Sequence, residues 1–440
     1  MAGTAAPAWR NWAGTETATA TEVRAPRDVD EISAAITDAA DRGQTVRARG
    51  SGHSFTAVGA AHDIALDLSH WTGIVAADET TGEVTVRSGT GLAAVNTALD
   101  GIGRALANLG DIDAQTVSGA ISTGTHGTGA RLGGIATQVS ALELVLADGT
   151  VAHCSATERP DLFAAARIGL GALGVISTIT LRTEPAFALA AEERPEPLDD
   201  VLANLDTNCA ENDHFEFYWF PYGHNALTKR NNRLPVGAQP KPLGRARRFF
   251  EYEVVENAAF GALCKIGRAI PALVRPLNKL SAAVLSPRTY SDVSHKVFVT
   301  SRRVRFVESE YAIPRDSLGD VLTELRAQVP RLAEPVMFPV EVRVAARDDI
   351  WLSTAYDRDS AYLAIHQYLG MPYRAYFDLF ESIVGAVGGR PHWGKMHTLD
   401  ADALRERYPR FDDFRRVRSE VDPGGRFRNP YCDRVLGQIA

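Results

Sequence analysis

Two glycine-rich segments in the first third of the chain restrict most strongly what it can fold into. Residues 49–55 read RGSGHSF and follow residues 45–49, whose period-two alternation predicts a strand. Residues 118–129 read SGAISTGTHGTG. Glycine lets the backbone approach an anion closely and Ser and Thr add donors, so such segments bind diphosphates when they are more than tight turns. Because both segments also place a histidine beside glycine and hydroxyl residues, we interpret them as a pair of phosphate-binding loops.

A third glycine motif argues against a nicotinamide site. Residues 169–174, GLGALG, match the GxGxxG pattern. The dinucleotide fingerprint requires a strand before the glycines and a helix after them. Here residues 161–167 are typical of a helix and residues 175–181 of a strand, so the order is reversed. We therefore reject a Rossmann-type dinucleotide site.

Helix and strand signals alternate along the chain and predict an α+β fold. Residues 28–39 open with an acidic capping box and continue with apolar residues at helical spacing. Asp148-Gly149 separates two apolar runs, as in a tight β-hairpin. The aromatic, alternating residues 214–221 predict a strand of a second sheet, and residues 294–300 and 337–346 predict further strands.

Composition and charge exclude several classes of protein. The chain has 440 residues, 47 basic against 54 acidic, and a net charge of −7, which argues against a nucleic-acid partner. Its four cysteines are far apart and form neither a disulfide framework nor a metal site, so we expect no metal. Residues 258–285 are apolar, but four basic residues and two prolines interrupt them, so they cannot span a bilayer. We expect this segment to pack as an amphipathic helix pair rather than to contact a membrane, and the protein to reside in a bacterial cytoplasm, with peripheral membrane contact left open.

An ordered set of motifs across nearly the whole chain resembles a known family. The chain is similar to the aldonolactone oxidoreductase branch of the vanillyl-alcohol oxidase superfamily, whose members carry FAD. This resemblance implies a two-part FAD-binding domain over residues 1–184 and an α+β substrate domain, or cap domain, over residues 185–400. It also implies that a C-terminal segment, residues 401–440, packs back near the flavin. The motifs are NWAG at 11–14, GSGHSF at 50–55, NLG at 108–110, STGTHGTG at 122–129, GALGV at 171–175, WFP at 219–221, SHK at 294–296, AIPR at 312–315, FPVEVR at 338–343, RDS at 358–360, RPHWGK at 390–395, DPGGRF at 422–427 and Asn429.

The resemblance also assigns cofactor residues. His53 stands where family members attach FAD covalently, through the 8α-methyl group of the flavin. Gly110 would lie beside the flavin carbon that reacts with O2, and a glycine there leaves a path for O2. This favours reoxidation by O2 with release of H2O2, while reoxidation by another acceptor stays open. The residues implied to contact FAD are Arg49, Gly50, Ser51, Gly52, His53, Ser54, Phe55, Gly110, Ser118, Gly119, Ser122, Thr123, Thr125, His126, Gly127, Gly174, Val175 and Ile176.

Three residues are implied to act on the substrate. Glu341 and Arg343 are two positions apart on a predicted strand, so both emerge on one face. The resemblance places them beside Lys395, where Glu341 would orient the substrate hydroxyl or accept its proton. Arg343 and Lys395 would supply positive charge where the reduced flavin becomes negative.

The implied reaction is oxidation of the C2 hydroxyl of an aldonolactone, with hydride passing to flavin N5. The substrate would be L-gulono-γ-lactone, giving L-ascorbate, or a D-arabinono-lactone. The alternative is an alditol oxidase acting on xylitol or sorbitol, which shares the Glu-x-Arg pair and the HWGK motif. The sequence leaves the preferred substrate and the oligomeric state open.

Overall fold

The computed structural model describes residues 8–300 and 302–439. A small parallel sheet lies close to the N-terminus, in the order β3 (Glu22–Arg24), β5 (Ile64–Asp67) and β4 (Val46–Arg49). Helix α1 (Val29–Asp41) connects β3 to β4, and its buried residues share a core with this sheet. Asp28 caps the helix because its carboxylate accepts a hydrogen bond from the amide of Glu31 at 2.7 Å, as the capping box predicts.

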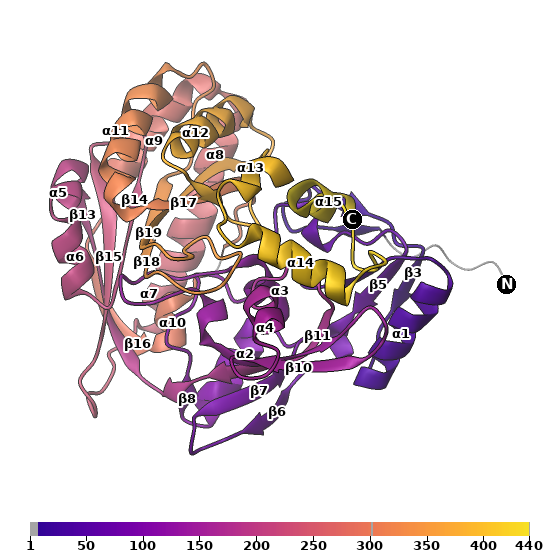
Figure 1. Ribbon diagram of the computed structural model, residues 1–440. Helices are drawn as coiled ribbons and strands as arrows, with labels where there is room; N and C mark the ends of the chain where they lie inside the picture. The colour runs from indigo at the N-terminus through magenta and orange to yellow at the C-terminus, as the bar shows by residue number, and fades with distance from the viewer. Residues whose placement is uncertain (1–7, 301, 440) are drawn as a thin grey trace.

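A five-stranded antiparallel sheet completes the N-terminal half of the molecule (Figure 1). The hairpin predicted at Asp148-Gly149 is confirmed, since this turn joins the antiparallel strands β9 (Val139–Val145) and β10 (Val151–Ser155). The reversed helix–strand order around the GxGxxG motif is confirmed too, because α4 (Pro160–Ala166) precedes it and a strand follows. In spatial order the strands are β10 (Val151–Ser155), β9 (Val139–Val145), β11 (Val175–Arg182), β7 (Glu83–Arg87) and β6 (Ile74–Ala77).

Two further helices, α2 (Leu92–Gly101) and α3 (Val117–Thr123), bury apolar residues in the core of this sheet. Helix α3 corrects the interpretation of residues 118–129 as a loop throughout, because the first six of them are helical. The reason is local: Thr116 caps the helix through the amide of Gly119, and Gly124 ends it at φ +81°. Short bridges complete this half, formed by β1 (Trp9–Arg10) with β2 (Thr17–Ala18) and by β8 (Arg104–Ala105) with β12 (Glu184–Pro185).

An eight-stranded sheet forms the second half of the molecule and stands upright in Figure 1. The strands expected at 214–221 and 337–346 are confirmed as its neighbouring strands β14 and β18. Helices α5 (Leu198–Ala203), α6 (Leu205–Glu211), α11 (Leu318–Gln328) and α12 (Arg374–Ala386) contribute to the apolar core on one of its faces. In spatial order its strands are β16 (Arg288–Val293), β13 (Ala188–Pro197), β15 (Asn225–Arg233), β14 (His214–Trp219), β18 (Val340–Ala345), β19 (Ser360–Tyr368), β17 (Phe306–Pro314) and β20 (Arg390–Pro391).

The strand predicted at residues 294–300 is wrong. The chain leaves the edge strand β16 and forms the short helix α10 (Ser294–Phe298). Its consecutive residues Val297 and Phe298 are both buried, in the core of the N-terminal half. A strand would point them to opposite sides, whereas packing across the two halves buries both.

The C-terminal helices α13 (Ala401–Arg405), α14 (Phe411–Val421) and α15 (Pro430–Leu436) return to the N-terminal half (Figure 1, yellow beside indigo). The amide of Asn429 donates hydrogen bonds to the carbonyl oxygens of Ala57, Val58 and Ala60 at 3.0–3.1 Å. The buried guanidinium of Arg47 donates to the carbonyl oxygen of Phe427 at 2.7 Å. These contacts fix the C-terminal helices against the residues on either side of the first glycine-rich segment.

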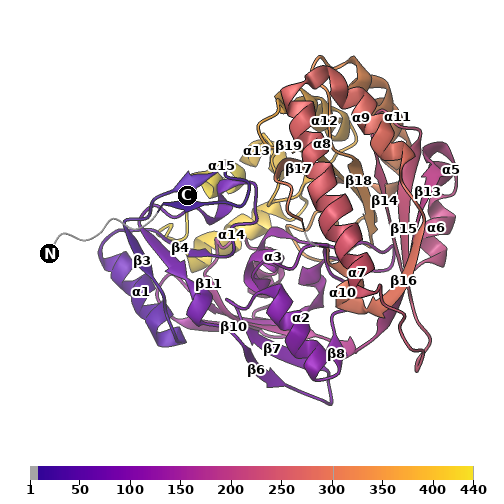
Figure 2. The same cartoon turned by 180° about the vertical axis from the view of Figure 1, so that it is seen from behind.

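One helical layer crosses the face seen in Figure 2. It consists of α7 (Arg245–Arg248), the π-helical η4 (Phe249–Ala259), α8 (Phe260–Ala269) and α9 (Val274–Ala283). Among the described residues, no helix combines the length and the hydropathy that crossing a membrane requires.

Candidate active site

A cavity is lined by the first glycine-rich segment and by residues of α3. The carbonyl oxygens of Gly52 and Ser54 accept hydrogen bonds from Trp12 and Asn11, which anchors the segment on its far side. No described residue accepts a hydrogen bond from the backbone amides of residues 51–54. These amides, with the hydroxyl groups that line the cavity, form a cradle suited to an anion.

Two glycines are required for this path of the backbone. A Cβ at position 50 would lie 2.7 Å from Oγ1 of Thr116, and Gly52 has φ +74°. Arg49 also lines the cavity, is paired with no carboxylate among the described residues, and has its Nε buried without a partner. Burial lowers the pKa of Arg49, against the smaller effect of Asp67. A partly buried cation beside free amides fits the diphosphate of FAD.

A second cavity adjoins the first, and the two share His53, Ser54, Gln115 and Thr123. Its walls include the aromatic side chains of Trp12, Phe55 and Phe306. They also carry charged groups from both halves of the molecule: Asp111, Glu308, Glu310, Arg343 and Lys395. The two cavities therefore lie side by side, one suited to an anion and the other lined by charged groups.

Most residues assigned to the cofactor line this space. Gly127 and Val175 do not line either cavity. A Cβ on Gly127 would overlap the carbonyl oxygen of Leu109 at 2.2 Å, and Val175 packs in the core beside α1. The first cavity contains Arg49, Gly50, Ser51, Gly52, His53, Ser54, Ser118, Gly119, Ser122, Thr123, Gly174 and Ile176, and the second adds Phe55, Gly110, Thr125 and His126.

His53 stands where the two cavities meet. Its ring stacks on Trp12 with the centroids 5.8 Å apart. Burial, followed by repulsion from Lys395, lowers the pKa of His53 below its usual value. The imidazole is therefore neutral at neutral pH and has a free nitrogen lone pair.

The register of the eight-stranded sheet collects charged side chains on one face. Strand β17 pairs with β19, and β19 with β18, so that Glu310 and Glu341 both lie opposite Ala364. On the next strand, β14, Glu216 lies opposite Arg343 and Tyr218 opposite Glu341. Residues paired across an antiparallel ladder point to the same side. This face is turned toward the second cavity.

Lys395 is held by two carboxylates of β17. Its Nζ lies 2.5 Å from Oε2 of Glu308 and 3.8 Å from Oε2 of Glu310. Burial alone would lower the pKa of Lys395, but attraction to these carboxylates raises it. On its other side Glu310 lies 2.8 Å from Nε2 of His126, whose Nδ1 contacts the carbonyl oxygen of Gly127. Lys395 is therefore a fixed cation in the second cavity.

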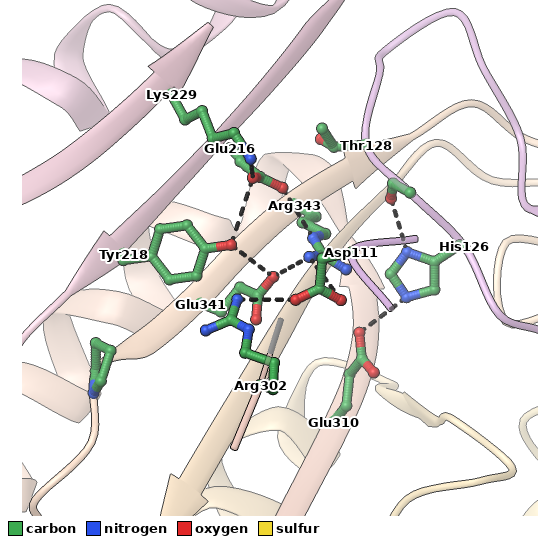
Figure 3. Close-up of polar contacts among 12 residues, drawn as sticks. Asp111, His126, Thr128, Glu216, Tyr218, Lys229, Arg302, Glu310, Glu341 and Arg343 are labelled. Carbon is green, nitrogen blue, oxygen red and sulfur yellow. Dashed lines mark hydrogen bonds and ion pairs between the residues drawn. The ribbon is translucent and has the colours of Figure 1, made fainter. Parts of the chain in front are cut away.

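Arg343 is the centre of a second group of charges (Figure 3). Its Nε donates to Oε2 of Glu216 at 3.0 Å, and its Nη2 contacts Glu341 and lies 3.4 Å from Asp111. Arg302 approaches Asp111 at 2.8 Å and Lys229 approaches Glu216 at 3.1 Å. Three carboxylates thus surround Arg343, with two more cations behind them.

Glu341 differs from the other acids of this group. It does not line the cavity itself but lies behind Arg343, and the hydroxyl of Tyr218 donates to its Oε1 at 3.2 Å. Burial, together with the nearby charges of Asp111 and Glu216, raises the pKa of Glu341 despite Arg343. By contrast, Lys229 and Arg343 overcome burial and hold the pKa of Glu216 near 2. The structure thus brings Arg343 and Lys395 to the cavity wall and places Glu341 behind them.

The sequence analysis missed Asp111, Glu216, Glu308 and Glu310. A signal for three of them was present, because Glu216 alternates with Tyr218 within an apolar strand and Glu308 alternates with Glu310. This is the same period-two pattern that singled out Glu341 and Arg343. Asp111 had no such signal, since it lies in a loop next to Gly110. His392 also lines the second cavity, and its burial lowers its pKa to about 4.

Comparison with known proteins agrees with this geometry. Residues 20–155 match the model of an FAD-binding domain, and residues 179–435 match that of the D-arabinono-1,4-lactone oxidase family. The chain is 42% identical over 431 residues to L-gulono-1,4-lactone dehydrogenase of Mycobacterium tuberculosis, covering 98% of this chain and 99% of that one. It is 33% identical over 435 residues to L-gulonolactone oxidase of Mus musculus, covering 97% and 98%. It is 30% identical over 439 residues to alditol oxidase of a Streptomyces species, covering 97% and 98%.

Solved structures show the same fold. Cholesterol oxidase from B. sterolicum superposes with a TM-score of 0.83 over 98% of this chain and 96% of its own, at 17% identity. The fold and the cavity define an FAD-dependent oxidoreductase of the vanillyl-alcohol oxidase type, with mixed helices and sheets as the sequence predicts. Within that class, the chain belongs to the D-arabinono-1,4-lactone oxidase family.

Proposed function

We propose that this protein oxidises the C2 hydroxyl of an aldonolactone to a ketone. The substrate is L-gulono-γ-lactone, whose product tautomerises to L-ascorbate, or a D-arabinono-lactone. One observation carries the proposal: the glycine-lined cavity suited to an anion adjoins a cavity walled by Arg343 and Lys395, and four residues line both. The names of the relatives from M. tuberculosis and Mus musculus support a lactone as the substrate.

FAD, when bound, supplies the acceptor for the hydride that leaves C2. Residues of the first cavity hold its diphosphate through the amides of residues 51–54 and through Arg49. Residues 1–184 form the FAD-binding domain, residues 185–400 the cap that carries the charged sheet face, and residues 401–440 the segment that packs back beside the flavin. O2 or another electron acceptor completes turnover.

Arg343, Lys395 and Glu341 have different tasks. Loss of hydride from C2 requires that the proton of the C2 hydroxyl leave as well. Glu341, with its raised pKa, is the group that orients this hydroxyl or receives its proton, and because it lies behind Arg343, the Arg343 side chain must shift for the hydroxyl to reach it. Arg343 and Lys395 orient the substrate oxygens and stabilise negative charge that develops during the transfer.

His53 attaches FAD covalently in this proposal. Its neutral imidazole at the junction of the cavities supports a bond to the 8α-methyl group. After acid precipitation of the protein, the yellow chromophore should remain with the polypeptide, and His53→Ala should release it to the supernatant. Release of all flavin from the unmodified chain would contradict the attachment and leave the redox reaction untouched.

The reaction itself is tested by mixing the purified yellow protein anaerobically with L-gulono-γ-lactone and, separately, with xylitol. Bleaching of the visible flavin band by the lactone alone is the expected result. Bleaching by xylitol alone would make the chain an alditol oxidase, the activity named for the Streptomyces relative. Admission of air then distinguishes O2 from another electron acceptor. If the flavin band returns rapidly and H2O2 is formed, the protein is an oxidase.

A further inference from the structure

His126 connects the two halves of the molecule at the second cavity. It belongs to the second glycine-rich segment, whereas its partner Glu310 lies on β17 of the eight-stranded sheet. Both side chains are buried and line the cavity. The ring of His126 also stacks on the ring of Tyr362 on β19, with the centroids 3.6 Å apart. Contacts on two strands of the sheet therefore hold the imidazole in one orientation.

Both ring nitrogens of His126 face hydrogen-bond acceptors (Figure 3). Nδ1 lies 2.8 Å from the carbonyl oxygen of Gly127, and Nε2 lies 2.8 Å from Oε1 of Glu310. Lys395 lies 3.8 Å from the other oxygen of this carboxylate. Although burial would raise the pKa of Glu310, the interactions with His126 and Lys395 lower it, so the carboxylate is ionised. With an acceptor at each nitrogen, the ring has to carry both protons, and stacking on an aromatic ring stabilises such a cation.

The charges around the second cavity balance only if His126 is one of the cations. Among the described residues, ion pairs in this region join five carboxylates to four Lys and Arg side chains. When Glu341 is ionised, the acids therefore exceed the Lys and Arg side chains by one. Glu310 is the carboxylate whose nearest Lys or Arg partner in the described chain is farthest away, at 3.8 Å. The carboxylates are Asp111, Glu216, Glu308, Glu310 and Glu341, and the cations are Lys229, Arg302, Arg343 and Lys395.

A second histidine near the same lysine offers a comparison. His366 of β19 has its Nε2 3.4 Å from Oε1 of Glu308 and its Nδ1 3.4 Å from the carbonyl oxygen of Pro339. Both distances are longer than an ordinary N–H···O hydrogen bond. Glu308 already has Lys395 as its cation, at 2.5 Å. Charge balance at Glu308 therefore does not require His366, whereas at Glu310 it requires His126.

We propose that His126 is a permanent imidazolium, the counter-ion of Glu310, and that its charge keeps the cavity from opposing the reduction of FAD. The inference rests on the proposed hydride transfer. C2 of the substrate gives up a hydride, which is two electrons and one proton, to FAD, and the hydroxyl proton leaves separately, so the flavin gains one negative charge. An uncompensated carboxylate in a buried site would repel that charge, because screening there is weak. His126 is thus a positioning residue that acts through Glu310.

The protonation state of His126 can be measured in the holoenzyme without any substrate. In NMR spectra of protein with isotope-labelled histidine, both ring nitrogens of His126 should show the shifts of a protonated imidazolium throughout the neutral pH range. His126→Gln removes these signals and so assigns them. Glu310→Gln should convert the ring to the neutral form. A neutral ring in the unmodified protein would overturn the proposal.

The midpoint potential of the flavin measures the effect of the charge. His126→Gln keeps a side chain that can donate to Glu310 but removes the positive charge. The potential should therefore become more negative, and flavin reduction by the lactone should slow roughly tenfold or more. Adding Glu310→Gln to this variant removes the uncompensated carboxylate and should restore most of both losses. His366→Gln is the matched control and should leave the potential near that of the unmodified protein.

The double variant separates charge balance from packing. If His126 served packing alone, the second substitution would not repair the loss, and this outcome would overturn the proposal. An equal loss in His366→Gln would overturn it as well. Redox dyes of known potential report the midpoint without the lactone. The expected shifts in a protein that the lactone fails to bleach would therefore support the charge balance and contradict the proposed substrate alone.

Discussion

Nζ of Lys395 lies 2.5 Å from Oε2 of Glu308, and both groups line the second cavity. The lysine is the last residue of the HWGK motif near the C-terminal end of the cap, whereas the glutamate belongs to β17, 87 positions earlier. Burial makes each charge depend on the other. The pair therefore places a permanent cation at a defined point of the cavity.

Removing the carboxylate of Glu308 should change the pKa of Lys395. Because Glu308 and Glu310 raise the pKa of Lys395, Glu308→Gln should lower that pKa. The rate of flavin reduction by the lactone should then begin to fall at a lower alkaline pH than in the unmodified protein. Anaerobic stopped-flow rates across a pH series measure this shift. An unchanged alkaline limb would show that Lys395 is not the titrating cation.

Truncation of the cavity cations should separate chemistry from cofactor binding. Lys395→Met and Arg343→Met remove positive charge from the wall of the second cavity, while the first cavity is untouched. We expect flavin reduction to slow by about 100-fold or more, the range for loss of one preorganised charge-stabilising group. FAD content, read from the visible spectrum, should stay near that of the unmodified protein. Equal reduction rates in the variants would remove these residues from the mechanism.

Ionisation of Glu341 should set the acidic limb of the pH profile of flavin reduction. Its pKa is raised by burial and by Asp111 and Glu216, so it is protonated, and unable to accept a proton, at pH values where an exposed glutamate is ionised. The reduction rate should therefore fall as the pH drops through a pKa above the ordinary value of about 4.3. Glu341→Gln should abolish this limb and slow reduction at every pH. The control is Glu79→Gln, which changes an exposed carboxylate distant in sequence from the site.

Arg47 should be a stability residue rather than a catalytic one. Its buried guanidinium donates hydrogen bonds to the carbonyl oxygens of Leu170, Gly171 and Phe427 at 2.7–2.9 Å. Arg47→Met leaves these buried acceptors unpaired, each at a cost of about 1–3 kcal/mol. We expect a lower thermal midpoint and faster proteolysis after residue 400, measured by calorimetry and limited digestion. Arg27→Met, at an exposed position, should leave both unchanged.

The anion-binding half of the site was readable from sequence because its determinants are local. Its short segments contain Gly52, which has φ +74°, and Gly50, where an added Cβ would clash with Thr116. The hydroxyl groups that line the cavity lie close to these glycines in the sequence. The hairpin at Asp148-Gly149 and the cap at Asp28 are local in the same way. The strand predicted for residues 294–300 failed for the opposite reason. Packing between the two halves buries both Val297 and Phe298, and this distant contact outweighs the local strand pattern.

The charged half depended on the tertiary structure. The sequence alone determined that Glu341 and Arg343 share a face, because alternation is a property of any strand. Only the order β14–β18–β19–β17 decided that Glu216, Glu308 and Glu310 lie on that same face and reach Arg343 and Lys395. Strand order and register are set by packing between distant segments, and no local periodicity encodes them. For the same reason the sequence showed that residues 258–285 are amphipathic, but only the fold decided which side of those helices the cap covers and which side stays exposed.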